Sequence, residues 1–269
     1  MTLNLDAYFA RIGYEGPRSA TLATVTRLSD LHTCTITFEA LDSFLGNPVS
    51  LEPTKVFAKL VESRRGGYCF EQNLLMHDVL AQLGYSVTPL GARVIAGVAE
   101  DAPATPVTHR FTVVDLPEGR FIVDVGFGSK CPTRPISLAA GVETETPQNT
   151  FRVVPYGAGF EVQFKNNSGW GGMYRFLDQQ YHLADHEMSN WYTSTFPNSK
   201  FVRNLIVTTV DETRRYNLLN RDLTTWHEFD KPETRRLETP RELEAVLVGT
   251  MKLDLPVSIQ TIWEKLPQA

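Results

Sequence analysis

The stretch R-R-G-G-Y-C-F-E-Q-N, residues 64 to 73, decides how this chain is interpreted, because two glycines and a tyrosine lead into a cysteine where a helix is expected to begin. From residue 69 to 83 apolar side chains recur at helical spacing, and Gly84 is a natural helix end. Gly66 and Gly67 permit a tight backbone. A helix start offers N–H groups and a positive dipole end, which favour a thiolate and can stabilise an oxyanion. Cys69 is therefore a candidate nucleophile, and a buried core cysteine is the alternative that this stretch leaves open.

The bulk composition is that of an ordinary globular chain. It has 269 residues, of which 42% are hydrophobic and 21% charged, so a sizeable core is expected. The formal net charge of −5 argues against nucleic acid or an anionic membrane as the main partner. The N-terminus lacks the order of a signal peptide, and no run approaches the ~20 apolar residues of a membrane span. Three cysteines without a C-x-x-C pair make neither a disulfide framework nor a structural zinc site. We expect a cytoplasmic protein, and the patterns leave a homo-oligomer open.

The residue pattern changes twice along the chain. Residues 1–84 have helical periodicity, with helices expected near 3–12, 19–31 and 69–83. Residues 85–182 contain short runs of β-branched and aromatic residues separated by turn clusters such as L-P-E-G, which predicts an antiparallel sheet or barrel. Residues 183–269 mix both patterns and end in two helices, the first of which Thr239 should cap. The expected elements of this last part are a helix near 183–194, strands at 202–210, 213–219 and 223–229, and helices near 239–251 and 258–265.

A histidine and an aspartate on consecutive strands can complete a catalytic site. His109 begins H-R-F-T-V-V-D, and Asp124 lies late in R-F-I-V-D-V-G. If these strands pair as a hairpin across L-P-E-G, the start of one lies beside the end of the other, and parity allows both side chains to face one side. An imidazole held by a carboxylate beside a thiol supplies a base and its orienter for a cysteine nucleophile. For each residue taken singly, an ordinary polar side chain at a strand end is the alternative.

The remaining histidines and cysteines are weaker candidates for catalysis or metal binding. His182 and His186 have a spacing close to that of metal ligands, but the H-E-x-x-H order and a third ligand are missing, so we expect no metal site. Cys34 is expected to be structural, and Cys131 lies in a loop without a base of its own. The other histidines are expected to make ordinary contacts: His32 and His77 as hydrogen-bonded helix residues and His227 on a strand surface.

Taken in order, R-G-G-Y-C-F-E-Q-N, T-H-R-F and V-D-V-G-F-G resemble the arylamine N-acetyltransferases. The opening A-Y-F-A-R-I-G-Y-E-G and the segment H-T-C-T-I-T-F-E-A-L-D are also similar to that family, so the resemblance spans essentially the whole chain. It implies an α+β protein with a cysteine-protease-like catalytic core in three parts. These are an N-terminal helical bundle (1–84) carrying the nucleophile, a central antiparallel β-barrel (85–182) carrying the base and acid, and a C-terminal α/β lid (183–269).

The resemblance implies a ping-pong reaction. Cys69 is the residue that takes acetyl from acetyl-CoA, His109 is its base, and Asp124 orients the base. An arylamine, hydrazine or arylhydroxylamine then attacks the thioester. Acetyl-CoA is thus a co-substrate, and no tightly bound cofactor is expected. The thiol and imidazole of the family can form an ion pair before substrate arrives.

Further residues match the family by motif. Arg64 and Glu39 resemble an ion pair that braces the cysteine loop, with an ordinary exposed pair as the alternative. The aromatic walls of the acceptor pocket correspond to Phe38, Phe127 and Phe201, for which plain core packing is the alternative. Positions around the acyl and CoA site correspond to Thr108, Gly126 and Gly128, and G-F-G allows backbone N–H groups to approach a ligand closely.

The sequence has no long insertion between the barrel and the C-terminal part, which suggests the shorter, bacterial type with a more open cleft. Two other kinds of function compete with arylamine acetylation. A Cys-His-Asp set also serves hydrolases, transglutaminase-like enzymes and amide synthases, which differ in what reaches the thioester second. A non-catalytic binding protein of the same fold is the second rival, and it predicts that Cys69 is no more reactive than Cys34.

Overall fold

The computed structural model describes residues 2–99, 101–211, 213–227 and 232–267. Its helices, including two short π-helices η1 and η2, are α1 (Leu5–Ile12), α2 (Leu22–Thr35), α3 (Leu41–Leu45), α4 (Pro53–Phe57), η1 (Ala58–Glu62), α5 (Cys69–Gln82), α6 (Leu183–Thr195), α7 (Lys200–Arg203), α8 (Pro240–Glu244), η2 (Ala245–Thr250) and α9 (Ile259–Lys265). Its strands are β1 (Phe38–Glu39), β2 (Ser86–Val94), β3 (Val107–Leu116), β4 (Gly119–Val123), β5 (Ile136–Ser137), β6 (Thr144–Thr146), β7 (Asn149–Tyr156), β8 (Gly159–Asn166), β9 (Gly169–Phe176), β10 (Ile206–Val210), β11 (Arg214–Leu219), β12 (Asp222–His227) and β13 (Glu233–Arg236).

The N-terminal helices follow the predicted periodicity and caps. Helix α1 begins after Asn4, whose side chain accepts the Ala7 N–H at 3.1 Å, and ends at Gly13, whose φ of 69° is left-handed. Helix α2 starts later than expected because Thr21 caps it by accepting the Thr24 N–H at 3.2 Å. The apolar faces of both helices and of α5 meet in one core.

Helix α5 begins at the cysteine, as predicted. Its third residue, Glu71, accepts the N–H of Tyr68 through Oε2 at 3.2 Å, which satisfies a donor at the helix start. The helix is buried along most of its length and stops just before Gly84, whose φ of 88° turns the chain into β2. Cys69 is thereby fixed on an element held in the core.

The central strands confirm the predicted antiparallel pairing. Within the described residues they form an eight-stranded sheet in the order β5-β4-β3-β2-β9-β8-β7-β6, which curls into a nearly closed barrel. The N–H of Ser137 on β5 donates to Thr144 Oγ1 on β6 at 3.3 Å and links the two end strands. Strands β3 and β4 form the predicted hairpin across 116–119, with Thr112 opposite Val123. The short β5 and β6 were not predicted.

The C-terminal strands form a second antiparallel sheet in the order β1-β10-β11-β12-β13. The predicted strand at 202–210 is wrong in its first part, because Ser199 caps the short helix α7 and only 206–210 is extended. Strand β13 was not predicted, and residues 228–229 of the strand expected at 223–229 lie outside the described residues. Thr239 caps α8 as predicted, accepting the Glu242 N–H at 3.2 Å, but the helix widens into η2 at Ala245.

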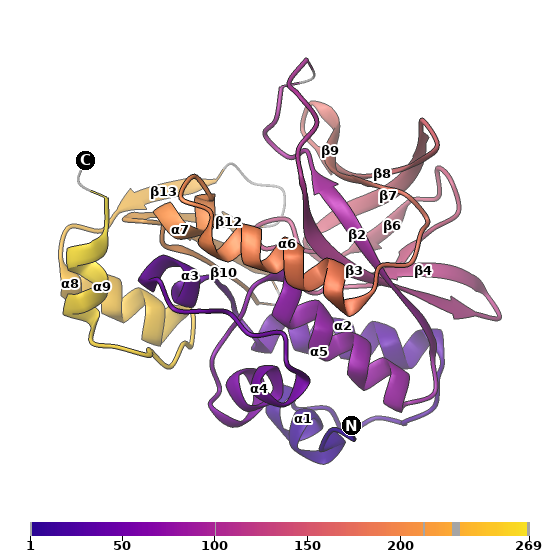
Figure 1. The fold of residues 1–269 in the computed structure, drawn as a ribbon, viewed down its shortest axis with the longest axis horizontal. Coiled ribbons are helices and arrows are strands. Elements are labelled where there is room, and N and C mark those ends of the chain that lie inside the picture. Colours follow the sequence, from indigo (N-terminus) through magenta and orange to yellow (C-terminus); the bar gives the residue numbers. More distant parts are fainter. Residues whose placement is uncertain (1, 100, 212, 228–231, 268–269) are drawn as a thin grey trace.

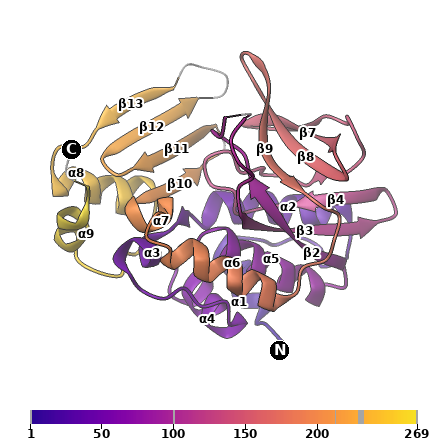
Figure 2. The ribbon, with the colours of Figure 1, turned by 45° about the horizontal axis from the view of Figure 1, so that its top comes forward.

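Figure 1 shows the N-terminal helices below, the barrel at the upper right and the C-terminal sheet with α8 and α9 at the left. Helix α6 runs between these regions, in front of α5 and β3, and the tilted view in Figure 2 agrees. Strand β1 comes from the N-terminal part of the chain but pairs with β10, so the region leading to Cys69 is joined to the C-terminal sheet. In the part of the chain described, no helix has the length and apolar character needed to cross a bilayer.

Candidate active site

Three elements bring the predicted nucleophile, base and acid together. Cys69 is the first residue of α5, His109 lies on β3, and Asp124 directly follows β4. Strand β3 pairs with β2 and β4, and His109 itself lies opposite Ala92 of β2, which holds its position. All three side chains are buried, with residue exposures of 4%, 2% and 3%.

The imidazole of His109 binds the carboxylate of Asp124. The two atoms His109 Nε2 and Asp124 Oδ2 lie 2.7 Å apart. This bond commits Nε2 to the acid and leaves Nδ1 as the ring nitrogen for Cys69. Burial alone would lower the pKa of His109, but the Asp124 carboxylate and the hydrogen-bonded Cys69 side chain raise it to about 9. A protonated imidazole is therefore stabilised beside the sulfur at neutral pH.

The sulfur of Cys69 also lies close to the strand that carries the base. Its distance to the backbone oxygen of Thr108 is 3.6 Å. Thr108, which was predicted to lie near the acyl site, therefore contacts Cys69 through its main chain. The first N–H groups of α5 are at the same end of the helix, and their partial positive charge favours negative charge there.

Asn73 is a site residue that the sequence interpretation missed. It lies one helical turn after Cys69, and its Nδ2 donates to Asp124 Oδ1 at 3.0 Å and to the Arg110 carbonyl at 2.6 Å. Its Oδ1 accepts the N–H of Val125 at 2.9 Å. The N–H of Gly126 also donates to Asp124 Oδ1, at 3.1 Å. Both oxygens of the buried acid are thus hydrogen-bonded. The signal was the spacing in C-F-E-Q-N, which puts Asn73 on the same helix face as Cys69.

Gly126 and Gly128, both predicted to lie near the acyl and CoA site, occupy positions where other atoms come close to the backbone. A Cβ on Gly126 would lie 2.9 Å from the Cα of Cys69 and 2.9 Å from Asn73 Nδ2. Gly128 has a φ of 81°, and a Cβ there would lie 3.3 Å from the ring of Phe38. Gly126 therefore allows the loop after Asp124 to pack directly on the start of α5.

The loop before Cys69 is tied to the edge of the C-terminal sheet. Gly67 bridges Phe38 in parallel, and its carbonyl accepts the N–H of Glu39 at 3.0 Å. A Cβ on Gly66 would lie only 2.2 Å from the Thr37 carbonyl oxygen, so this position requires glycine. The tight backbone predicted from the two glycines is thus used to hold the loop against β1.

The predicted pair of Arg64 and Glu39 is wrong by one residue. Arg65 Nη2 binds Glu39 Oε1 and Asp42 Oδ1, each at 3.1 Å. Arg64 has a left-handed φ of 49°, a turn that the sequence does not reveal, and its neighbour carries the pairing instead.

A lysine completes the charge cluster beneath the cysteine loop. Lys59 Nζ binds Glu71 and Asp42, each at 2.7 Å. Burial would lower the pKa of Lys59, but Glu71, Glu39 and Asp42 raise it above its ordinary value. The cluster therefore joins η1 to the first turn of α5 and to the chain that follows β1.

The predicted aromatic residues lie in two groups. Phe127 is half-buried and meets the His109 ring edge-on, with centroids 5.1 Å apart. Phe38 and Phe201 contact each other at 6.2 Å, and Phe201 meets Tyr68 at 5.6 Å. Both are buried in the N-terminal core, so core packing remains an alternative for this pair. The Tyr68 hydroxyl donates to Asn190 on α6, which fixes the residue before Cys69.

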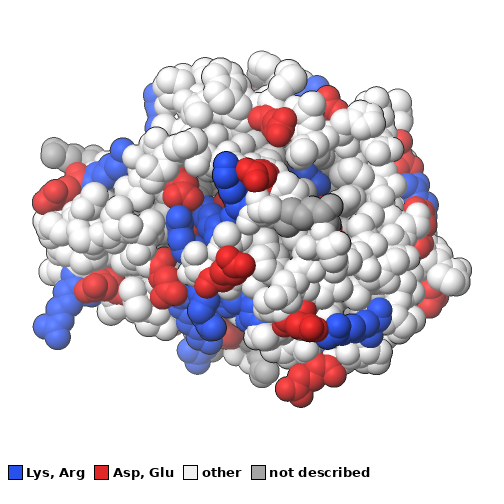
Figure 3. Space-filling model, turned by 60° about the horizontal axis from the view of Figure 1, so that its bottom comes forward, with Lys and Arg blue, Asp and Glu red and all other residues white. Residues whose placement is uncertain are grey.

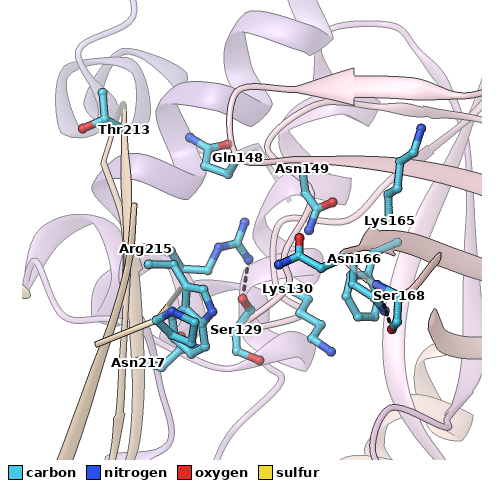
Figure 4. A pocket seen from close by; sticks show the side chains of 14 residues that line it. Ser129, Lys130, Gln148, Asn149, Lys165, Asn166, Ser168, Thr213, Arg215 and Asn217 are labelled. Carbon is cyan, nitrogen blue, oxygen red and sulfur yellow. Dashed lines mark hydrogen bonds between the residues drawn. The ribbon is translucent and has the colours of Figure 1, made fainter. Parts of the chain in front are cut away.

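A cavity of about 740 Å³ lies between the barrel and the C-terminal sheet. The triad does not line it, but Ser129 and Lys130 do, and they follow the G-F-G segment that packs on Cys69. Figure 4 shows Lys130 and Lys165 on the barrel side, with Arg215 on β11 opposite and hydrogen-bonded to Ser129. Burial lowers the pKa of Arg215 to about 10. Two lysines and an arginine thus surround this cavity.

The remaining predictions have mixed outcomes. The buried sulfur of Cys131 donates to the Asp124 carbonyl at 3.3 Å, and burial raises the pKa of this thiol. His32 is hydrogen-bonded as predicted, to Tyr8 and Gln72. His77 is not: its Nδ1 has no partner among the described residues. Nor do the described residues contain a group of three or more side chains able to hold a metal, around His182, His186 or elsewhere. The side chain of His227 lies outside the described part.

Comparisons with known proteins show the family of this chain. The N-acetyltransferase family model matches residues 21–260. An arylamine N-acetyltransferase of Mycobacterium tuberculosis (strain ATCC 25618 / H37Rv) is 40% identical over 268 residues, or 98% of this chain and 93% of that protein. The structure of M. smegmatis arylamine N-acetyltransferase has a TM-score of 0.94 at 34% identity, covering 98% of this chain and 99% of the other. That of the Mycobacterium marinum enzyme in complex with CoA has a TM-score of 0.94 at 33% identity, covering 97% and 98%. The chain belongs to the arylamine N-acetyltransferase family of acyltransferases.

Proposed function

We propose that this protein transfers an acetyl group from acetyl-CoA to the nitrogen of an arylamine, hydrazine or arylhydroxylamine, through an acetyl-Cys69 intermediate. The observation that carries the proposal is the buried arrangement of Cys69, His109 and Asp124, in which Nε2 of the imidazole binds the acid at 2.7 Å. The relatives that match 92% of the chain or more are named arylamine N-acetyltransferases, which supports transfer to an arylamine over the alternatives.

In the first step the sulfur of Cys69 attacks the carbonyl carbon of acetyl-CoA while His109 holds the thiol proton on Nδ1. The bond between the carbonyl carbon and the CoA sulfur then breaks. His109 returns the proton to that sulfur, so CoA leaves as a thiol and Cys69 keeps the acetyl group. The N–H groups at the start of α5 stabilise the oxyanion that forms in between.

In the second step the amine nitrogen attacks the acetyl-Cys69 carbonyl and gives a proton to His109. The S–C bond breaks, the amide leaves, and the proton returns to the sulfur. Asp124 is held at both oxygens, by Asn73 and Gly126 at one and by the imidazole at the other. Its role is to orient the ring and stabilise the imidazolium.

The co-substrate is proposed to occupy the cavity between the barrel and the C-terminal sheet. Its volume of about 740 Å³ suits a molecule the size of a nucleotide, and Lys130 and Lys165 offer charge to the phosphates of acetyl-CoA. The segment 126–130 connects this cavity with the start of α5. For the acceptor, the edge-on contact of Phe127 with His109 supports a flat aromatic amine beside the base.

Two stages of one experiment test the proposal. Acetyl-CoA without an amine should add one acetyl group to the peptide that contains Cys69, as seen by mass spectrometry. Adding aniline or phenylhydrazine should then remove that group and release the acetylated product. Cys69→Ser should abolish both stages, whereas Cys34→Ser, which removes a thiol on α2 that is not part of the proposed triad, should retain them.

The alternatives give different outcomes. A Cys-His-Asp hydrolase would release acetate or cleave a peptide without acetylating the amine. A transglutaminase-like enzyme or an amide synthase would ignore simple anilines and require its own acyl donor. Peptide cleavage without acetyl transfer, or equal iodoacetamide reactivity of Cys69 and Cys34 at mildly acidic pH, would overturn the proposed function.

A further inference from the structure

A second site lies on the side of the molecule formed by the N-terminal helices and the C-terminal segment. It is a cavity of about 380 Å³ lined by Arg11, Arg64 and Lys252, with Asp254 and Cys34 among the other lining residues. Three cations and one carboxylate leave an excess of two positive charges in a chain whose net charge is −5. Figure 3, which brings the lower side of Figure 1 forward, shows basic side chains gathered towards the middle of that face, with acidic ones among them.

Two of the three cations project from unusual backbone. Arg64 has a φ of 49° and Lys252 a φ of 53°, and the only other non-glycine residue with positive φ among those described is Asn220. Arg64 follows the C-cap of η1 and Lys252 that of η2, and a left-handed residue is common just past a helix end. These two helix ends, from segments far apart in the sequence, bring both cations to the same cavity.

Among the described residues, the cations of this cavity lack an ionic partner. Within the described residues, no carboxylate lies within 4.0 Å of the charged groups of Arg11, Arg64 or Lys252. Burial and the charge of Arg64 lower the pKa of Arg11, which Asp254 only partly offsets. The cationic charges therefore oppose each other, and an anion between them would relieve the repulsion.

Each of the three cations lies at the C-terminal end of a helix, and these ends bring the positive charges together at one cavity. Arg11 lies in the last turn of α1, where a cation is favourable, and its guanidinium donates to the carbonyls of Leu60 at 3.1 Å and Arg64 at 3.4 Å. Arg64 and Lys252 directly follow the ends of η1 and η2, where a cation is also favourable. The guanidinium fork of arginine matches a phosphoryl group, and an excess of two charges matches a dianion.

We propose that the cavity lined by Arg11, Arg64 and Lys252 binds a phosphoryl dianion, as inorganic phosphate or as a small phosphomonoester. The volume exceeds that of phosphate, so a small organic substituent fits. The site is separate from the cavity proposed for acetyl-CoA, and no residue lines both. It lies at the base of the cysteine loop, since Arg64 precedes the Arg65 that binds Glu39.

Thermal unfolding and titration calorimetry of the full chain test this site without any acyl transfer, so the result is independent of the proposed activity. Inorganic phosphate should raise the melting temperature in a saturable way beyond sodium chloride of equal ionic strength. Arg64→Gln and Lys252→Gln should each weaken phosphate binding by about tenfold or more, because each removes a charge-assisted contact. Glucose 6-phosphate distinguishes the two sources: tighter binding than phosphate identifies a phosphomonoester, and equal or weaker binding identifies the free ion.

Two control variants remove a charge elsewhere. Arg235→Gln, on the exposed strand β13, and Lys130→Gln, in the cavity proposed for acetyl-CoA, should leave phosphate binding within about twofold of the unmodified protein. Circular dichroism checks that each variant is folded, and Lys252→Gln serves alone if Arg64→Gln is not. No saturable effect beyond chloride, or a loss of phosphate binding in Lys130→Gln rather than in Lys252→Gln, would refute the site.

Discussion

At the scale of single residues, the buried carboxylate of Asp124 decides how the site works. A buried charge is costly unless its oxygens are paired, and here each one is: Oδ2 by His109, Oδ1 by Asn73 and Gly126. The carboxylate in turn is the main favourable influence on the imidazole, whose pKa it helps to raise to about 9. A substitution that removes the charge of Asp124 but keeps the shape of its side chain should therefore separate its effect on the His109 ring from its contribution to packing.

We expect Asp124→Asn to lower kcat by roughly 10²- to 10⁴-fold, because an amide no longer stabilises the imidazolium and can favour the wrong tautomer. The pKa of His109 should move down from about 9, since its charge partner is lost and burial then dominates. Steady-state kinetics and an NMR titration of the His109 ring measure the two effects.

Asp115→Asn is the matched control, because it makes the same change on β3, the strand that pairs with β4. Asp115 is exposed and binds Arg120 at 3.0 Å on the surface. This variant should change kcat by less than about twofold and leave the titration of His109 in place. A His109 midpoint that stays near pH 9 in Asp124→Asn would contradict the assigned cause.

At the scale of elements, the start of α5 is held from two sides. The charge cluster of Lys59, Arg65 and their carboxylates fixes it to β1 and η1, and the loop after β4 packs on it through Gly126. The helix start is therefore placed by tertiary contacts as well as by its own cap. Each contact can be removed by one substitution and compared with a control variant in which the same type of residue is replaced elsewhere.

Arg65→Met should destabilise the protein by roughly 3 kcal/mol, because it leaves the fully buried Glu39 side chain with only the more distant Lys59 as its cation. Arg64→Met, one residue away, should cost no more than about 0.5 kcal/mol, since Arg64 makes no ion pair among the described residues. Urea unfolding measures both. Equal losses in the two variants would show that the cluster does not depend on Arg65.

Gly126→Ala should lower kcat/KM by about tenfold or more, because the added Cβ pushes against the Cα of Cys69 and against Asn73. The same clash should cost about 1–3 kcal/mol of stability. Gly249→Ala in η2 is the control: a Cβ there meets no atom within 4 Å, and stability should be unchanged or slightly higher. Activity of Gly126→Ala equal to that of the control would mean that the loop can shift freely.

At the scale of the whole molecule, histidines whose pKa values shift in opposite directions make the stability depend on pH. Burial lowers the pKa of His32 and of His77 to about 4 and that of His186 to about 3. His109 moves the other way, to about 9, because of Asp124. The lowered groups lie on α2, α5 and α6, which surround the site, so their protonation affects how these helices pack.

These shifts predict that the histidine contribution to stability is greatest near pH 6.5. Below that value the unfolded chain binds protons that the three neutral histidines reject, so stability falls as the pH drops towards 4. Above it the favoured protonated state of His109 is progressively lost, so stability falls as the pH rises through about 9. The acid side should be steeper, because three groups act there against one.

Urea unfolding between pH 5 and 9 measures this profile. His32→Asn removes one of the three lowered groups and should reduce the slope on the acid side, although it lowers stability at every pH by disturbing the contacts with Tyr8 and Gln72. The slope on the alkaline side should not change. An acid slope that is the same in this variant would exclude His32 as a contributor.

Many features of this structure are determined by interactions between residues that lie close together in the sequence. Asn4 and the left-handed Gly13 set the ends of α1, Thr239 caps α8, and the pattern around the two glycines placed Cys69 at the start of a helix. The hairpin across 116–119 brought His109 and Asp124 to one side. These predictions hold because the interactions concerned are local, so the sequence that specifies them is contiguous.

Tertiary structure alone decided the rest. Whether Arg64 or Arg65 faces Glu39 depends on a single left-handed turn, and Asn73 meets Asp124 only once α5 packs across β3. The short strands β1, β5 and β6 are too brief to have a pattern of their own and exist because longer strands pair with them. The cationic cavity likewise joins residues from opposite ends of the chain. Contacts between distant segments carry no signal in local spacing, because packing and burial choose the partners after the elements have formed.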